Sequence, residues 1–242
     1  MKNKGSLFKL LANLGYCSRK EAPSFILEHQ VIFKNKKIFE NCDLVPDSVD
    51  NEPLDPLFPL TIAIDKPVGY VCSRSHSEGC AIYDLLPPRF LRRTPLLAPV
   101  GRLDRDTSGI LLLTDDGQLN HLLTSPKNHL PRVYHVKLER PLKTSAATLL
   151  TEGKLILNGE NKPLKPAKLE IINQQECYLT IYEGKHHQVK RMFEATNNQV
   201  TDLRRIKFGN LSVTTISDGK FKILSAEEIK NLVATEAHAQ SV

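Results

Sequence analysis

The sequence has no long apolar run and no paired cysteines, and each absence argues against a class of protein. No apolar stretch reaches the roughly 20 residues of a membrane-spanning helix, so we expect neither a transmembrane segment nor a membrane partner. The five cysteines are odd in number and include no C-x-x-C pair, which favours reduced thiols in the cytoplasm over a disulfide scaffold. Lys9 interrupts the apolar start and no small-residue cleavage site follows, so we predict a folded N-terminus rather than a signal peptide.

Groups of metal ligands are equally scarce. Cys72, His76 and Cys80 could supply three zinc ligands, but no fourth is evident nearby, and an ordinary loop is the simpler interpretation. His186 and His187 are adjacent, so their side chains should point in different directions, and the sequence has no H-E-x-x-H pattern. We therefore predict no metal site.

Charge is distributed in blocks along the 242 residues. The net charge of +6 and the pI of about 9.0 favour a polyanionic partner. Residues 1–48 contain eight basic and five acidic residues, residues 49–60 contain three acids and no base, and residues 61–242 contain 25 basic and 19 acidic residues. The acidic, proline-bearing stretch at 49–60 is typical of a linker. It predicts a small domain over 1–48, a larger domain over 61–233 and a flexible tail over 234–242.

The N-terminal block predicts two helices and a hairpin. Ser18 and Glu21 have the spacing of a capping box, so we expect a helix to begin there and to bend or restart at Pro23. Alternating apolar and polar residues at 31–40 predict a short hairpin with its turn at Asn35-Lys36. An earlier helix is predicted from four leucines at amphipathic spacing: Leu7, Leu10, Leu11 and Leu14. Such a block has too small a core to be an enzyme by itself.

The run LLANLGYCSRKEA within this block resembles the S4 RNA-binding domain. The residues that carry the resemblance are Leu14, Gly15, Ser18, Arg19 and Ala22. The resemblance implies that the block binds RNA, and we assign the contacts to Ser18, Arg19 and Lys20. The alternative is a solvated basic face without a partner.

After residue 60, strand-like segments outnumber helix-like ones. Several neighbouring strands look like hairpins rather than crossover units, which favours a mostly antiparallel mixed sheet flanked by helices. The predicted fold class is therefore α+β, with the small N-terminal S4-like module attached to a larger catalytic domain. The strands are expected at 61–65, 110–113, 132–139, 177–184 and 203–209, and the helices at 118–124, at 187–198 and after a second capping box at Ser225 and Glu228.

Opposite charges gather in front of the apolar run at 110–113, in the stretch GRLDRDTSGILLLTDDG (101–117). In an extended segment Leu103 would face the core, while Arg102 and Asp104 would share the opposite side. A neighbouring guanidinium keeps a carboxylate ionised where water is scarce, and such a carboxylate suits nucleophilic attack on a sugar carbon. The alternative is a plain Arg–Asp pair that closes the end of a strand. Asp106 could be a second, acid/base carboxylate, but nothing marks it for that role.

The same stretch resembles, nearly residue for residue, the signature of the pseudouridine synthases, in particular the branch that modifies small-subunit ribosomal RNA. The stretches KPVGYVCS (66–73), RVYHVKL (132–138) and EGKHHQVKRMFEATNN (183–198) support the resemblance in the right order. It implies that Asp104 attacks the uridine, at the ribose C1′ or at the base, so that the base detaches, turns and rejoins through C5. The uridine must leave its stack to reach this residue. The isomerisation is redox-neutral, so no cofactor is implied.

The resemblance also implies roles for Tyr134 and Arg102. Tyr134 is expected to stack on the target base and to take part in removing the C5 proton. The alternative is a strand tyrosine packed in the core beside Val136 and Leu138, which share its face. Arg102 is expected to complete the ionic surround of Asp104.

Lys190 stands where the resemblance implies a basic partner of Asp104. The alternative is an i,i+4 helix pair with Glu194. The sequence departs from the family pattern at Arg132, where a lysine is common, and at His186, where an aromatic residue such as tyrosine is more usual.

The basic residues Lys66, His187 and Arg191 are predicted as further RNA contacts. The sequence thus predicts a cytoplasmic, monomeric enzyme that isomerises a uridine in small-subunit (16S) ribosomal RNA or in an assembly intermediate. HLLTSP (121–126) and NGENKPLKPAKLE (158–170) favour this branch. One alternative is a large-subunit (23S) synthase with nearly the same motifs. Another is a non-catalytic ribosome-assembly factor, although a pure binder needs no buried nucleophile.

Overall fold

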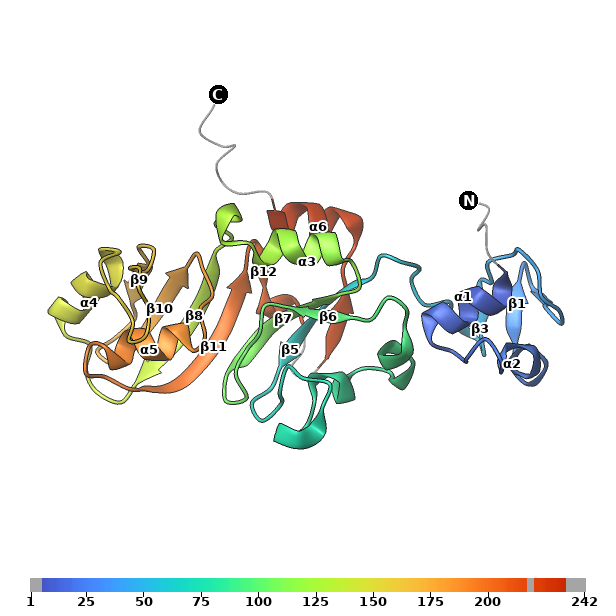
Figure 1. Cartoon of the computed structure of the whole chain (residues 1–242), viewed down its shortest axis with the longest axis horizontal. Coiled ribbons are helices and arrows are strands. Elements are labelled where there is room, and N and C mark those ends of the chain that lie inside the picture. Colours follow the sequence, from blue (N-terminus) through green and yellow to red (C-terminus); the bar gives the residue numbers. More distant parts are fainter. Residues whose placement is uncertain (1–5, 217–219, 234–242) are drawn as a thin grey trace, which may run out of the picture.

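The computed structural model describes residues 6–216 and 220–233, so the tail predicted at 234–242 lies outside the described residues. These residues form a small N-terminal module and a larger domain (Figure 1). No helix in them is both long and apolar enough to cross a membrane.

The N-terminal module packs two helices against a four-stranded sheet. Its elements are α1 (Leu7–Leu14), α2 (Ala22–Glu28), β1 (Val31–Phe33), β2 (Lys36–Lys37), β3 (Ser48–Val49) and β4 (Glu52–Pro53), and the strand order is β2-β1-β3-β4. The four leucines of α1 are buried, as their spacing predicts. β3 and β4 fall largely inside the predicted linker, so the boundary predicted at residue 48 is too early. Strands of two residues are too short to leave a periodic pattern in the sequence.

The predicted capping box of α2 is present. The Ser18 hydroxyl accepts a hydrogen bond from the Glu21 N–H at 3.2 Å, and the Glu21 carboxylate accepts one from the Ser18 N–H at 2.8 Å. The helix itself begins only at Ala22, so Pro23 lies in the first turn, where its missing N–H costs no hydrogen bond. The hairpin turns at Lys34 and Asn35, which have φ of 47° and 61°, one residue earlier than predicted.

The larger domain is built on a sheet of nine strands within the described residues. The main path runs β13-β5-β7-β11-β8-β10-β9, with β6 paired to β7 and β12 paired to β11. Only the β7–β11 pair is parallel in this sheet as described, so the predicted mostly antiparallel mixed sheet is confirmed. The strands are β5 (Thr61–Lys66), β6 (Ala98–Val100), β7 (Ser108–Thr114), β8 (Arg132–Leu138), β9 (Lys168–Ile171), β10 (Glu176–Ile181), β11 (Val200–Phe208), β12 (Leu211–Ser212) and β13 (Phe221–Ile223).

Helices cover both faces of this sheet. α3 (Gly117–Thr124) and α6 (Ala226–Val233) lie side by side over one face (Figure 1), where Leu123 and Leu232 pack in one cluster with Phe208. α4 (Thr144–Thr151) and α5 (Gln188–Glu194) contribute to the cluster on the other face, in which α5 buries Met192 and Phe193. Short 3-10 helices complete the connections: η1 (His76–Glu78), η2 (Ile82–Leu85), η3 (Pro88–Arg92), η4 (Pro126–Asn128) and η5 (Val213–Thr215).

β7 is buried on both faces. Leu111 and Leu113 belong to the apolar cluster beneath α4 and α5, while Ile110 and Leu112 belong to the cluster beneath α3 and α6. A strand covered on both faces needs apolar side chains at every position, which explains the continuous run at 110–113.

The parallel β7–β11 pair joins the two halves of the sheet. Ser108 is opposite Arg204 and Gly109 is opposite Arg205. Gly109 has φ of +106°, and a Cβ on it would lie 2.2 Å from the backbone oxygen of Arg205. Glycine is therefore required for the two backbones to approach this closely. Because the strands are parallel, the loop before β7, which contains Asp104, and the helix before β11 meet at the same end of the sheet.

The N-terminal module is docked on η3. Arg89 donates two hydrogen bonds to the carboxylate of Asp55, from Nε at 2.5 Å and from Nη2 at 2.9 Å. The Tyr16 hydroxyl accepts the N–H of Asp55 at 3.1 Å, and the Arg89 guanidinium lies over the Tyr16 ring. The N–H of Thr94 donates to the carbonyl of Asn13 at 2.8 Å. Hydrogen bonds and a bidentate ion pair therefore hold the two parts together, in addition to the covalent connection.

We predict that Asp55 and Arg89 are energetically coupled, because the Asp55 side chain is only 7% exposed and pairs with a planar, bidentate donor. In a double-mutant cycle with Asp55→Asn and Arg89→Met, the interaction energy in urea unfolding should be about 1–3 kcal/mol. Glu52→Gln is the matched control, because Glu52 also faces Arg89 but is 71% exposed, and its effect should stay below about 1 kcal/mol. Additive effects of the two changes would contradict this docking contact.

Candidate active site

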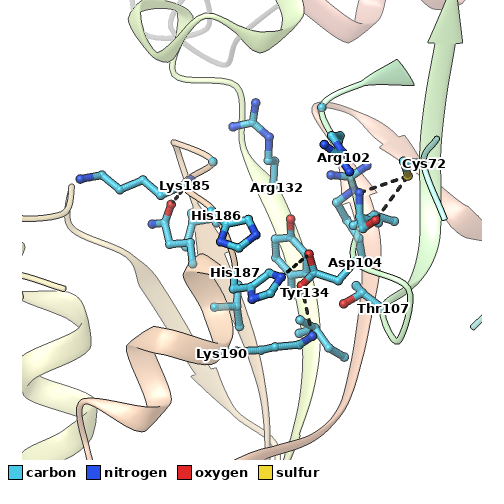
Figure 2. Close-up of a pocket in the computed structure, with 18 of the residues that line it drawn as sticks. Cys72, Arg102, Asp104, Thr107, Arg132, Tyr134, Lys185, His186, His187 and Lys190 are labelled. Carbon is cyan, nitrogen blue, oxygen red and sulfur yellow. Dashed lines mark hydrogen bonds and ion pairs between the residues drawn. The ribbon is translucent and has the colours of Figure 1, made fainter. Parts of the chain in front are cut away.

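A cavity of about 700 Å³ opens where the loop before β7 meets β8, β11 and the start of α5. Figure 2 shows Tyr134, His187 and Lys190 gathered around Asp104, whereas Lys185 and Arg132 extend away from it. The lining includes three of the predicted catalytic residues, Asp104, Tyr134 and Lys190, and also the fourth, Arg102.

Asp104 lies in the loop that enters β7. Its Oδ2 accepts a hydrogen bond from Lys190 Nζ at 3.1 Å, and its Oδ1 lies 3.3 Å from His187 Nε2. The side chain is 27% exposed, so the carboxylate is held between two basic groups and still reaches the cavity. The preceding Leu103 is buried, as predicted, and its backbone N–H and C=O are both hydrogen-bonded to the thiol of Cys72.

Lys190 bridges two carboxylates. Its ammonium also contacts Asp106 Oδ1 at 2.5 Å, so the side chain is directed at the loop before β7, and a helix pair with Glu194 does not describe its role. Burial lowers the pKa of Lys190, but its hydrogen bonds to Asp106 and Asp104 outweigh burial and raise the pKa above its ordinary value. Burial likewise raises the pKa of Asp106, but the hydrogen bond and charge of Lys190 bring that pKa below its ordinary value. Lys190 therefore remains a cation beside Asp104.

Arg102 does not take the place predicted for it. Its side chain is exposed at the rim of the cavity, and within residues 6–216 and 220–233 it forms no ion pair with Asp104. The segment is not regularly extended, because Gly101 has φ of +67° and a turn begins at Arg105. The side chains that contact the Asp104 carboxylate are instead those of His187 and Lys190.

Tyr134 is packed in the core of the domain and also borders the cavity. It is 7% exposed on β8 and shares its buried face with Val136 and Leu138, as a packed strand tyrosine would. Its ring also lines the cavity, close to the Asp104 carboxylate (Figure 2). A flat ring with one side open beside a carboxylate can support a planar base.

Lys66 is not available to RNA, contrary to the prediction. It is 0% exposed, and its ammonium donates to the carbonyls of Pro67, Tyr70 and Arg105 at 3.0, 2.8 and 3.4 Å. Burial lowers its pKa from 10.5 to about 8, against the opposing charges of Cys72, Asp106 and Asp104. Lys66 thus ties β5 to the loop that presents Asp104.

The other predicted RNA contacts differ in accessibility. Arg191 is engaged with its own domain, because it donates to the carbonyls of His186 and Asn158 and pairs with Glu160 at 3.6 Å. His187 contacts Asp104, as described above. Ser18 acts as a helix cap, which leaves Arg19 and Lys20 as exposed cations on the N-terminal module.

The loop at 72–80 has structural partners. The Cys72 thiol is engaged by Leu103, and His76 lies 3.6 Å from Asp84. Among the described residues, no three His, Cys, Asp or Glu side chains are arranged to hold a metal ion.

Among the cavity residues that have no role in the prediction from sequence are Thr107, Arg132 and Arg205. Arg205 is only 1% exposed and donates from Nε to the carbonyl of Ile110 at 2.8 Å. A signal was present, because Arg205 and Arg132 occupy inward positions of strands whose other inward residues are apolar.

Comparison with known proteins gives concordant similarities. A family model described as RNA pseudouridylate synthase matches residues 61–195. The chain is 38% identical over 243 residues to the RNA pseudouridine synthase YtzG of Bacillus subtilis, covering 96% of this chain and 99% of that protein. It is 42% identical over 171 residues to the ribosomal small subunit pseudouridine synthase A of Haemophilus influenzae, covering 70% and 72%. A crystal structure of a pseudouridylate synthase matches with a TM-score of 0.66 at 34% identity, over 94% of this chain and 99% of that chain.

We predict that Lys66→Met destabilises the chain, because it removes the ammonium that hydrogen-bonds to three inward carbonyls and leaves those of Pro67 and Tyr70 without that donor. The free energy of unfolding should fall by about 1–3 kcal/mol, and the Gly69 amide, which donates to Arg105, should exchange its hydrogen faster. Lys207→Met, at an exposed position of β11, is the control and should change little. Equal stability of the two variants would contradict this role.

The lowered pKa of Lys66 also predicts the direction in which stability changes with pH. The pKa of Lys66 is about 8 in the folded chain and is near its ordinary 10.5 when the chain is unfolded. Between these values the unfolded state binds the extra proton, so stability of the wild type should rise relative to Lys66→Met as pH increases from 8 to 10.5. A constant difference over this range, measured by urea unfolding, would contradict the lowered pKa.

Proposed function

The chain belongs to the RNA pseudouridylate synthase family, and we propose that it converts one uridine of small-subunit ribosomal RNA to pseudouridine with Asp104 as the nucleophile. The observation that carries the proposal is the carboxylate of Asp104, held between Lys190 and His187 and open to a cavity bordered by Tyr134.

The reaction requires one glycosidic bond to break and another to form on the same ribose. In one version the Asp104 carboxylate attacks C1′, and the C1′–N1 electron pair leaves with the uracil. The uracil turns, its C5 attacks C1′, and the carboxylate leaves with the electrons of its ester bond. C5 then loses its proton while N1 gains one, so atoms, charge and oxidation state balance. Attack of Asp104 on the base is the other version.

The neighbouring side chains suit these steps. Lys190 holds the Asp104 carboxylate by an ion pair, and it offsets the charge that returns to Asp104 when the ester bond breaks. Asp106 holds the second side of the same ammonium and so fixes its position. Tyr134 offers a ring face to the uracil and a hydroxyl near the C5 proton, and its place on a buried strand keeps it rigid.

The substrate assignment rests on relatives. Several proteins similar to this chain are named ribosomal small subunit pseudouridine synthase A, including those of Haemophilus influenzae and Escherichia coli. The exposed Arg19 and Lys20 on the docked N-terminal module provide a second basic surface away from the cavity. RNA gripped at two separated points is recognised by its shape, which favours folded ribosomal RNA over a short oligonucleotide.

The test is pseudouridine mapping after incubation of purified protein with small-subunit RNA, large-subunit RNA and a minimal stem-loop. We expect one new pseudouridine in the small-subunit RNA and much slower reaction on the stem-loop. Asp104→Asn should abolish the product but keep RNA binding, since the amide preserves shape without the nucleophile. Asp202→Asn, at a half-exposed position of β11, is the matched control and should remain active.

Each other outcome has a defined meaning. Product in large-subunit RNA alone would assign the chain to the large-subunit enzymes. More than a trace of product from Asp104→Asn would remove the proposed nucleophile.

Lys190→Met should reduce turnover by about 100-fold, because a partly buried cation next to the reacting carboxylate is lost. Lys190→Arg should retain part of the activity, since it keeps the charge. Glu194→Gln tests the helix pair directly and should leave turnover unchanged. If the Met and Gln variants lose similar, small amounts of activity, Lys190 serves the helix and not the reaction.

A further inference from the structure

Two buried arginines line the cavity at a distance from the reacting groups. Arg132 on β8 is 6% exposed, and Arg205 on β11 is 1% exposed. Both guanidinium groups lie over the ring of Phe208, at 5.4 and 5.2 Å from its centroid. β8 and β11 pair so that Phe208 is opposite Arg132 and Arg205 is opposite Tyr134, which places all four residues next to one another.

Neither arginine has an acidic partner among the described residues. Arg205 donates to the Ile110 carbonyl, but its Nη2 is buried without a hydrogen-bond partner. The Arg132 guanidinium makes no hydrogen bond or ion pair within residues 6–216 and 220–233. Two carboxylates line the cavity, those of Asp104 and the exposed Glu78. The Asp104 oxygens are held by Lys190 and His187, and among the described residues neither carboxylate pairs with Arg132 or Arg205. The charge of the two guanidinium groups is therefore not balanced by the protein.

The carboxylate of Glu183, which is close to Arg132 in the fold, is also engaged by other residues. Glu183 precedes Gly184, which lies beside the Arg132 guanidinium. Its Oε1 accepts the Lys165 N–H at 2.8 Å and Gln188 Nε2 at 3.3 Å. Burial is the main cause that lowers the pKa of Arg132, and the neighbouring cation of Arg205 lowers it further. An anion bound beside Arg132 would offset both the cost of burying its charge and the repulsion from the neighbouring Arg205.

The position of Arg132 indicates which part of an RNA substrate could supply that anion. Figure 2 shows its side chain extending away from Asp104, between His186 on one side and Arg102 on the other. A uracil against Tyr134 and a ribose at Asp104 would leave the backbone of the same nucleotide to run along this side. The backbone carries a phosphate on each side of the ribose, and guanidinium groups bind phosphate oxygens with charge-assisted hydrogen bonds.

We propose that Arg132, supported by Arg205, binds a backbone phosphate that flanks the isomerised uridine. The proposal rests on the proposed function and adds a binding residue to it. Arg132 contacts the phosphate, and Arg205 is a positioning residue that stacks on the same ring and raises the local positive charge. The exposed Arg102 marks the side from which the backbone enters. The site thereby fixes the nucleotide through its backbone as well as its base.

The experiment is a binding cycle between enzyme variants and RNA with single neutral linkages. The RNA is the shortest small-subunit fragment that wild-type protein isomerises, and methylphosphonate replaces one phosphate at a time around the target uridine. In the Asp104→Asn background, one flanking methylphosphonate should weaken binding by about 10- to 100-fold. Arg132→Met should weaken binding to unmodified RNA by a similar factor and should be insensitive to that same methylphosphonate. Arg132→Lys should recover part of the affinity.

The controls separate this contact from a structural role and from general charge. Arg140→Met removes an exposed arginine outside the cavity and should keep the full methylphosphonate penalty. If the losses of affinity caused by Arg132→Met and by the methylphosphonate are additive, the phosphate is bound elsewhere and the proposal fails. The same additivity would result if the Arg132 guanidinium contacted a uracil carbonyl instead of a phosphate. If Arg132→Met fails to fold, the neutral, polar Arg132→Gln takes its place, and an unchanged methylphosphonate penalty in that variant overturns the proposal. If wild-type protein isomerises no fragment, the proposed function fails instead.

Discussion

The site depends on one backbone contact, the parallel pairing of β7 with β11 at Gly109. The residues that meet at Asp104 come from the loop before β7 and from α5, 86 positions apart in the case of Lys190. Only a parallel pair places the entries of both strands at one end of the sheet, because an antiparallel pair would put them at opposite ends. The 2.2 Å between a Cβ at position 109 and the Arg205 carbonyl leaves glycine as the residue that fits. The close approach of these two strands therefore sets the relative positions of Asp104, Lys190 and the cavity floor.

The chain keeps several charges inside the larger domain, and each supports the loop or the cavity in a different way. The Lys66 ammonium donates hydrogen bonds to three carbonyls of the turns around Asp104, in the place of water. Arg205 donates one to the carbonyl of Ile110 on β7. Burying such groups costs more than burying apolar side chains of similar size. Their hydrogen bonds fix backbone turns that apolar packing leaves free to shift. The attack proposed for Asp104 requires such a fixed geometry, because the carboxylate must be aligned with the reacting atom.

The sequence predicted the features that depend on neighbours along the chain. The capping boxes at Ser18 and Ser225, the continuous run of β7 and the alternation in β8 are local patterns, and all are present. The resemblance pointed to Asp104, Tyr134 and Lys190, which do meet at one cavity, although their chemical roles remain predictions. Arg102 was misplaced because the prediction assumed an extended segment, whereas Gly101 is left-handed. Lys66 was misplaced because its ammonium is buried against three backbone carbonyls, which no local pattern in the sequence reveals. β3 and β4 were missed because their stability comes from pairing with β1 rather than from their own composition.

The docking of the N-terminal module bears on how a target is chosen. Arg89 lies in η3 next to Phe90, which is buried in the same apolar cluster as Leu111 and Tyr134, so the pair with Asp55 is anchored to the core that carries the cavity. A module docked in this way holds Arg19 and Lys20 at a fixed position relative to the cavity, which a module on a free linker would not do. RNA that contacts both surfaces must then match the fixed span between them, and an unstructured strand loses conformational entropy to do so. Folded RNA has already lost that freedom. Under the proposed function, the fixed span set by this docking favours a structured RNA substrate.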